Sequence, residues 1–237
     1  MKILYIFPHP DDESFGPAPA ISAQIREGHE LYLLTLTKGE ATKQRHKLGV
    51  SKKEMGKIRF KEMQCVEKVL GLAGMTVTDL PDNNLKNINP KRIETVVEDH
   101  IHQLKPDVVV TYAVHGISGF HDHLVTHAVV KRVFCDLKDR GSDYPKRLAL
   151  YTRQGEVVQN NDFRLSASKD EEIGFVQQCN EEDHEKFHRA LDCYETYQDV
   201  IERSGVRDVV DDEVAFEIFG EKHDKRLSSI TADLPDY

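Results

Sequence analysis

The feature that most constrains the fold is an apolar run near the start of the chain that leads directly into a polar turn. The run covers residues 3–7 and is followed by Pro8-His9-Pro10-Asp11-Asp12-Glu13-Ser14. A short continuous apolar run is typical of a strand buried on both faces of a parallel sheet. The prolines end this strand, because proline lacks a ladder N–H and restricts the residue before it. The polar turn should therefore lie at the carboxyl end of the first strand, where open α/β sheets bind their ligands.

Two residues of this turn have the spacing of metal ligands. His9 and Asp12 are three residues apart, so an imidazole and a carboxylate can point at one ion. This pair would form half of a zinc site and would leave Asp11 free to transfer a proton. A simpler interpretation is that Ser14 or Asp12 only caps the next helix. We favour the metal site, because two prolines and three acidic residues around a histidine exceed what a cap needs.

The chain then alternates between strand and helix patterns. Strands are predicted at 30–36, 77–80, 107–112 and 147–152, and helices at 21–27, 52–70, 90–104 and 124–137. Such alternation indicates βαβ units. We therefore predict an α/β fold with a Rossmann-like, doubly wound, mostly parallel sheet and helices on both faces.

Other segments have weaker patterns. We expect a mobile loop at 41–50, short β segments in a variable region at 153–180, a long polar helix at 181–203, an edge strand at 213–219 and a frayed tail at 222–237. Neither a repeat nor a domain boundary is evident. Residues 1–237 are therefore predicted to form a single domain.

Composition excludes some classes of function. The net charge is −9, from 41 acidic and 32 basic residues among 237, which argues against a nucleic-acid partner. No apolar run approaches the roughly 20 residues of a membrane span, and no signal-peptide pattern is present. We therefore expect a cytoplasmic protein without a transmembrane segment. The four cysteines lack CxxC spacing, so reduced structural thiols are expected at Cys65, Cys135, Cys179 and Cys193.

A second polar turn follows the strand predicted at 107–112. It contains two glycines and ends in His121-Asp122-His123. If the two strands are neighbours, both turns meet in one crevice, and one of these histidines completes a three-ligand site with an open fourth position. That pattern is typical of a catalytic zinc. His127 lies one helical turn after His123 and could be a fourth ligand, a residue supporting the ligands, or a surface residue.

These two turns resemble the motifs of the PIG-L/LmbE-like family of zinc-dependent deacetylases, which act on N-acetylglucosamine conjugates. The first turn is a full match. Smaller agreements extend over much of the chain, at Thr37-Lys38-Gly39-Glu40, Arg59-Phe60-Lys61-Glu62, Leu70-Gly71, Lys186, Ala190 and Tyr194-Glu195-Thr196-Tyr197-Gln198.

The resemblance implies a role for individual residues. The implied zinc ligands are His9, Asp12 and His123, and the implied general base is Asp11. Arg59 and Asp82 fall where the family contacts the sugar or its aglycone. Without the resemblance, Arg59 would be taken as a helix-surface charge and Asp82 as a turn former.

One position departs from the family pattern. The second motif usually reads Gly-His-Pro-Asp-His, and its first histidine stabilises the tetrahedral intermediate, whereas Phe120 stands there in this chain. We expect His121 to take this role through a shifted turn and Asp122 to orient a neighbouring imidazole. Otherwise the metal alone stabilises the intermediate. His115 is a more remote candidate for the role of the missing histidine.

The predicted function is removal of the N-acetyl group from an amino-sugar conjugate by zinc-activated water. The alternative is a zinc-retaining binding protein that has lost turnover. A nucleotide-binding enzyme is disfavoured, because no GxGxxG follows the first strand. Residues 41–50 and 153–180 should select the aglycone, and a homo-oligomer is possible.

Overall fold

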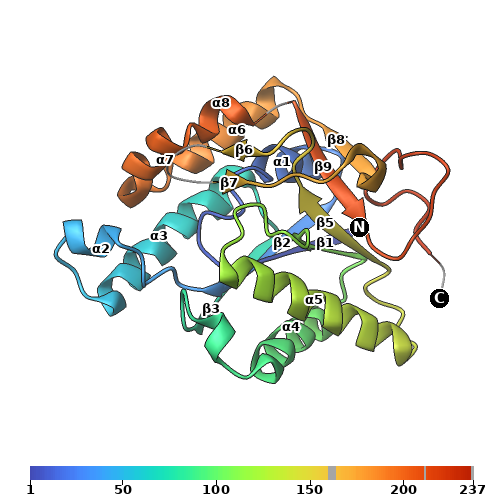
Figure 1. The fold of residues 1–237 in the computed structure, drawn as a ribbon, viewed down its shortest axis with the longest axis horizontal. Coiled ribbons are helices and arrows are strands. Elements are labelled where there is room, and N and C mark those ends of the chain that lie inside the picture. Colours follow the sequence, from blue (N-terminus) through green and yellow to red (C-terminus); the bar gives the residue numbers. More distant parts are fainter. Residues whose placement is uncertain (160–163, 211, 236–237) are drawn as a thin grey trace.

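A seven-stranded sheet organises the chain. The computed structural model describes residues 1–159, 164–210 and 212–235. The strands lie in the order β3-β2-β1-β4-β5-β9-β8. Figure 1 labels all of these strands except β4. Their bounds are β1 Lys2–Phe7, β2 Glu30–Thr37, β3 Gly74–Leu80, β4 Val108–Tyr112, β5 Arg147–Thr152, β8 Phe175–Gln178 and β9 Glu213–Ile218. A separate small ribbon pairs β6, Val158–Gln159, with β7, Arg164–Leu165.

The first five strands of this sheet are parallel, and β1 lies between β2 and β4. Ile3 is paired with Leu31 on one side and with Val108 on the other. Because the strand order reverses at β1, the carboxyl ends of β1 and β4 border the crevice in which such sheets bind ligands. The predicted doubly wound, mostly parallel fold is therefore confirmed.

Helices cover both faces of the sheet, as Figure 1 shows. On one face, α1, α3 and α6 pack against Ile3, Tyr5 and Phe7, and on the other, α4 and α5 pack against Leu4 and Ile6. The alternate residues of β1 thus belong to two separate apolar clusters, as expected for a strand without an exposed face. The helices are α1 Ala18–Arg26, α2 Gln44–Lys47, α3 Lys52–Leu70, α4 Pro90–Leu104, α5 His121–Asp139, α6 Glu181–Asp192, α7 Gln198–Ser204 and α8 Val206–Val209, with short 3₁₀ turns at Leu85–Asn87, Asp170–Glu172 and Glu195–Tyr197.

Local sequence signals account for several helix ends. Ser51 and Glu54 form a reciprocal capping box at the start of α3, and Gly71 ends that helix with φ 78°. Asn89 caps α4 ahead of Pro90. Helix α5 begins at His121, three residues before the predicted start. The His121-Asp122-His123 motif therefore lies in the first turn of a helix rather than in a loop.

The structure differs from the sequence prediction in three of the expected elements. The long helix expected at 181–203 is divided into α6, a 3₁₀ turn and α7, because the chain leaves the helix at Cys193 and Tyr194. The strand β9 is not an edge strand, since it pairs antiparallel with β5 on one side and β8 on the other. The expected loop at 41–50 contains the short helix α2.

The tail expected to fray is instead attached to the sheet. Arg147, which is fully buried at the start of β5, donates to the carbonyl oxygens of Ile230 and Ala232 at 2.7 and 2.8 Å. Its guanidinium also pairs with Glu221 at 2.7 Å. Leu227 and Ile230 are buried in the apolar cluster that also contains Ile3, Tyr5 and Phe7. The buried guanidinium explains the order of the tail, because it needs these acceptors.

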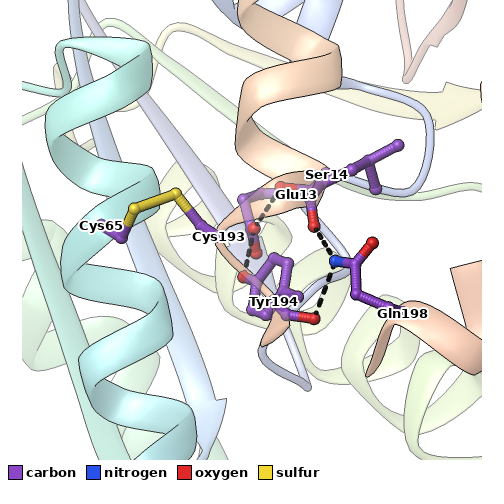
Figure 2. The surroundings of a disulfide bond; sticks show 7 residues. Glu13, Ser14, Cys65, Cys193, Tyr194 and Gln198 are labelled. Carbon is purple, nitrogen blue, oxygen red and sulfur yellow. Dashed lines mark hydrogen bonds between the residues drawn. A yellow bond between two sulfur atoms is a disulfide. The ribbon is translucent and has the colours of Figure 1, made fainter. Parts of the chain in front are cut away.

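The prediction that all four cysteines are reduced was wrong for two of them. Cys65 of α3 and Cys193 at the end of α6 form a disulfide, while Cys135 and Cys179 are free (Figure 2). The two partners are 128 residues apart, and the packing of α3 against α6 brings them together. A pairing of this kind leaves no spacing signal in the sequence.

Among the described residues, none of the helices combines the length and the apolar character needed to cross a membrane.

Candidate active site

The two polar turns meet in the wall of a cavity of about 1230 Å³. The first turn follows β1, and the second region is the loop after β4 together with the first turn of α5. The cavity wall includes His9, Asp11, Asp12, Asp122 and His123. The structure therefore brings together residues that are more than one hundred positions apart in the chain, as the sequence predicts.

Three side chains form a group that could hold a metal ion. Nitrogen and oxygen atoms of His9, Asp12 and His123 all lie within 4.8 Å of one another. His9 Nδ1 is 3.5 Å from Asp12 Oδ2, and His123 Nε2 is 3.2 Å from Asp12 Oδ1. Ligands at about 2.1 Å from a tetrahedral zinc are about 3.4 Å apart, which is close to both of these distances, so the donors fit such an ion.

The backbone around His123 determines which ring nitrogen faces the site. His123 Nδ1 lies 2.9 Å from the carbonyl oxygen of Gly116, which can accept only from a protonated nitrogen. The Nε2 lone pair is therefore left for a metal. Gly116 has φ 60°, and a Cβ there would lie 2.8 Å from the Cβ of His123. A glycine is needed at this position of the turn.

Asp122 and Asp82 surround the other nitrogen of His9. His9 Nε2 is 3.3 Å from Asp122 Oδ2 and 3.5 Å from Asp82 Oδ1. Asp122 also accepts the N–H of Leu85 at 3.1 Å, and Asp82 accepts the N–H of Ala41 at 2.6 Å. Asp122 thus lies within reach of an imidazole, which is the arrangement that its predicted orienting role requires. Asp82 reaches the cavity but is already engaged with the 41–50 loop and His9.

Charges around Asp12 favour its ionised form. Burial alone would raise the pKa of Asp12, but the imidazoles of His123 and His9 lower that pKa far below its usual range. Conversely, burial would lower the pKa of His9, and hydrogen bonds to Asp12 and Asp122 raise it well above 6.5. The Tyr112 hydroxyl donates to Asp12 at 2.7 Å, and its ring stacks on His123 at 4.3 Å.

Asp11 lies beside this donor set in an unusual backbone conformation. Its φ is 91°, a region that residues other than glycine seldom occupy. Burial raises the pKa of Asp11 to about 7, and the opposing charge of Arg59 limits the increase. A carboxyl group that titrates near neutrality suits general-base chemistry.

Arg59 lies in the wall of the same cavity, but most of its contacts are with other groups of the protein. Its side chain is 1% exposed, and its guanidinium donates to Asp11 at 2.7 Å, to the carbonyl oxygen of Pro10 at 2.8 Å and to Glu62 at 3.1 Å. The guanidinium also lies over the rings of Tyr194 and Tyr197. Arg59 therefore supports Asp11 and has little surface left with which to contact a substrate.

His121 does not occupy the position expected of it. As the first residue of α5 it is exposed, with Nδ1 3.4 Å from Lys86 Nζ, and it is absent from the cavity wall. The helix begins earlier than predicted and turns this side chain outward. Phe120 is part of the wall and is 63% exposed, with its ring perpendicular to His123 at 5.5 Å.

The other two histidines have structural partners. His127 Nδ1 lies 2.8 Å from the carbonyl oxygen of Tyr112, inside the packing of α5 against β4. His115 accepts the N–H of Ile117, and its Nε2 is 3.2 Å from both Thr152 and Ser168. Neither residue belongs to the groups of potential metal donors among the described residues.

Sequence reasoning did not identify two tyrosines that support the site. Tyr112 is the last residue of β4, and Tyr194 donates to the buried Glu13 and accepts the N–H of Asp11. Tyr112 could have been found as a polar tip on an otherwise apolar strand. For Tyr194 the only signal was its place in the family resemblance.

Curated relatives are named as deacetylases of N-acetylglucosaminyl conjugates. The bovine (Bos taurus) N-acetylglucosaminyl-phosphatidylinositol de-N-acetylase is 29% identical over 158 residues, which cover 65% of this chain and 56% of that protein. The chain spans about half the length of the curated relatives it matches.

Solved structures share the fold. N,N′-diacetylchitobiose deacetylase from Pyrococcus horikoshii matches with a TM-score of 0.68 at 16% identity, over 92% of this chain and 83% of that one. The 4-carboxy-2-hydroxymuconate hydratase GalB from Pseudomonas putida matches with a TM-score of 0.67 at 13% identity, over 96% and 99%. These two proteins have different named activities, so the fold alone does not decide the reaction.

The family profile described as PIG-L, GlcNAc-PI de-N-acetylase, matches residues 4–134, which include both polar turns. Because this match covers more than half of the 237 residues, the chain belongs to the PIG-L family.

Proposed function

We propose that this protein is a zinc-dependent amide hydrolase that removes the N-acetyl group from an N-acetylglucosamine-type conjugate. One observation carries the proposal: Asp11 lies directly beside the His9–Asp12–His123 donor group, in the wall of a cavity. A hydratase shares the fold, so the proposal rests on this site and on the family, not on the architecture.

Two imidazoles and one carboxylate suit zinc, and three protein ligands leave a position open for water or substrate. Zinc held there would polarise the acetamide carbonyl and lower the pKa of a bound water toward ~7. The remaining steps can be assigned to side chains of this chain.

Asp11 is the proposed general base. It accepts a proton from the water that attacks the acetamide carbon, and Arg59 holds one of its oxygens at 2.7 Å during this transfer. The C–N bond then breaks, and the proton on Asp11 passes to the departing nitrogen, so that an amine and acetate are released. Asp122 holds His9 in orientation throughout.

Phe120 favours a second candidate, a protein that keeps zinc and binds the conjugate with little turnover. A phenyl ring cannot donate a hydrogen bond to the oxygen of the tetrahedral intermediate. The loss of one such donor typically costs ~10²–10³ in rate. If this protein is an enzyme, we expect it to be slower than a relative with histidine at this position.

The test measures acetate and free-amine release from a panel of N-acetylglucosamine conjugates, with the zinc-loaded protein and its Asp11→Asn variant. We expect release by the wild type and a fall in kcat of ~10²-fold or more in the variant, with zinc content unchanged. Zinc binding without release from any conjugate would support the binding protein instead. Activity of Asp11→Asn within a few-fold of wild type would remove Asp11 from the mechanism.

We also propose a cytoplasmic location. Support comes from the two free thiols, Cys135 and Cys179, and from cysteine spacing that lacks the pattern of a disulfide framework. In that compartment a disulfide such as Cys65–Cys193 would form and break with the redox state, rather than persist.

A further inference from the structure

The Cys65–Cys193 disulfide joins the two elements that support Asp11. Cys65 is on α3, which also carries Arg59, and Cys193 directly precedes Tyr194 (Figure 2). Cys65 is exposed, whereas Cys193 is buried. The disulfide therefore connects an exposed position on α3 with the buried segment next to Tyr194.

Tyr194 connects this link to the site. Its side chain is fully buried, and its hydroxyl accepts the N–H of Asp11 at 2.9 Å while donating to Glu13. Gln198 Nε2 donates to the carbonyl oxygen of Tyr194 at 3.0 Å and so fixes its backbone (Figure 2). One phenol thus holds the turn on both sides of Asp12.

The conformation of Asp11 explains why such support is needed. A non-glycine residue with φ 91° is strained, and such strain persists only where the surroundings determine the backbone on several sides. Tyr194 holds the N–H of Asp11, while Arg59 holds its carboxylate and the carbonyl oxygen of Pro10. The disulfide fixes the distance between the two elements that supply these groups.

We infer that the Cys65–Cys193 disulfide is a redox-sensitive clamp that positions Asp11 through Tyr194. The inference rests on the proposed function, since it assigns a regulation to the same base. Glu62 accepts the N–H of Thr196 at 2.7 Å, so α3 and the 194–197 turn remain in contact after reduction. Reduction therefore loosens the clamp without releasing it.

The chemical step is thiol–disulfide exchange with a dithiol reductant. A thiolate of the reductant attacks the exposed Cys65 sulfur, the S–S bond breaks, and Cys193 leaves as a thiolate that takes up a proton. The second thiol of the reductant then displaces Cys65, which is released as a thiol. Two electrons and two protons pass to the protein, and the reductant becomes a cyclic disulfide.

The test uses two variants, Cys65→Ser and Tyr194→Phe, alone and together. Cys65→Ser removes the disulfide without the need for a reductant, which would compete for zinc. We expect Tyr194→Phe to lower kcat about tenfold, the effect of a lost hydrogen bond, with KM and zinc content unchanged. Cys65→Ser should lower kcat about threefold to fivefold. Because both act through the same hydroxyl, the double variant should be no slower than Tyr194→Phe alone.

A second readout does not depend on activity. Amide hydrogen exchange at Asp11 should be slow in the oxidised wild type and faster in Cys65→Ser, in Tyr194→Phe and in wild type reduced with a phosphine that carries no thiol. Cys135→Ser, which changes a free thiol on α5, should keep both kcat and protection at wild-type values. Multiplicative losses in the double variant, or unchanged protection in Cys65→Ser, would overturn the clamp. If the wild type releases no amine, the proposed function fails, and hydrogen exchange still decides the clamp.

Discussion

The position of Arg59 leads to a prediction that separates support of the base from substrate binding. We consider Arg59→Lys, which keeps the positive charge. The guanidinium serves Asp11, Pro10 and Glu62 at once, at 2.7, 2.8 and 3.1 Å. A single ammonium on a shorter side chain cannot reach all three acceptors. The variant should therefore lose at least one charge-assisted hydrogen bond to Asp11 or to the turn beside it.

The size of the effect follows from the kind of bond that is lost. A hydrogen bond to a charged group contributes about 1.5–3 kcal/mol, which corresponds to a fall in kcat of roughly 10- to 150-fold if it acts only on the base. KM should stay within about twofold, because a side chain that is 1% exposed contributes little to ground-state binding. The ion pair between Arg59 and Asp11 is largely buried, so the free energy of unfolding of Arg59→Lys should also fall by about 1–3 kcal/mol.

Steady-state kinetics on one N-acetylglucosamine conjugate give kcat and KM separately. They are measured at a temperature at which circular dichroism shows that the variant is folded. Arg132→Lys, an exposed position on α5, is the matched control and should leave both constants unchanged. A rise in KM with kcat unchanged would refute the reasoning and return Arg59 to the substrate-binding role expected from the sequence.

The remaining predictions address the metal, the departure from the family pattern and acid stability. His123→Ala should lose most of the bound zinc, measured by mass spectrometry, while His127→Ala retains it. His121→Ala should keep kcat within about twofold, and Phe120→His should raise it by up to about tenfold, because only position 120 faces the cavity. Burial opposes the ionisation of Asp183, but contacts with Arg26, Asn180 and Ser22 lower the pKa of this carboxyl group in the folded protein. Its contribution to the free energy of unfolding is therefore complete above the unfolded pKa of about 3.9 and is lost as the pH falls through the folded pKa. In Asp183→Asn, the free energy of unfolding measured with urea should fall less steeply as the pH is lowered through the acid range. An unchanged dependence on pH would contradict the prediction.

Much of the parallel half of the fold could be predicted from sequence, because each signal was local. The runs that became β1 and β4 are apolar throughout, and Ser51, Asn89 and Gly71 mark helix ends with well-understood chemistry. The three candidate metal donors, His9, Asp12 and His123, could be proposed for the same reason. Each lies directly after a recognisable strand, and parallel strands bring their carboxyl ends to one edge.

The errors concern features that depend on tertiary contacts. The helix pattern after Glu181 continues past Cys193, yet the chain leaves the helix there, where the disulfide and the buried Tyr194 lie. The alternation of β9 resembles an edge strand, although β8 covers its far side. Whether Arg59 faces solvent or Asp11 depends on the packing of α3 beside the first turn, which periodicity does not reveal.

The order of strands in the sheet divides the cavity between two parts of the chain. The part that matches the family profile, residues 4–134, contains every proposed metal ligand, the base and Arg59. Another part of the wall comes from β5, β9 and the α7–α8 segment, including Tyr151, Val206 and Val214. Under the proposed function, substitutions in this part of the wall, away from Cys193 and Tyr194 that support Asp11, can change which conjugate is accepted while the hydrolytic step is kept. A family match to the first part alone thus identifies a reaction more securely than it identifies a substrate.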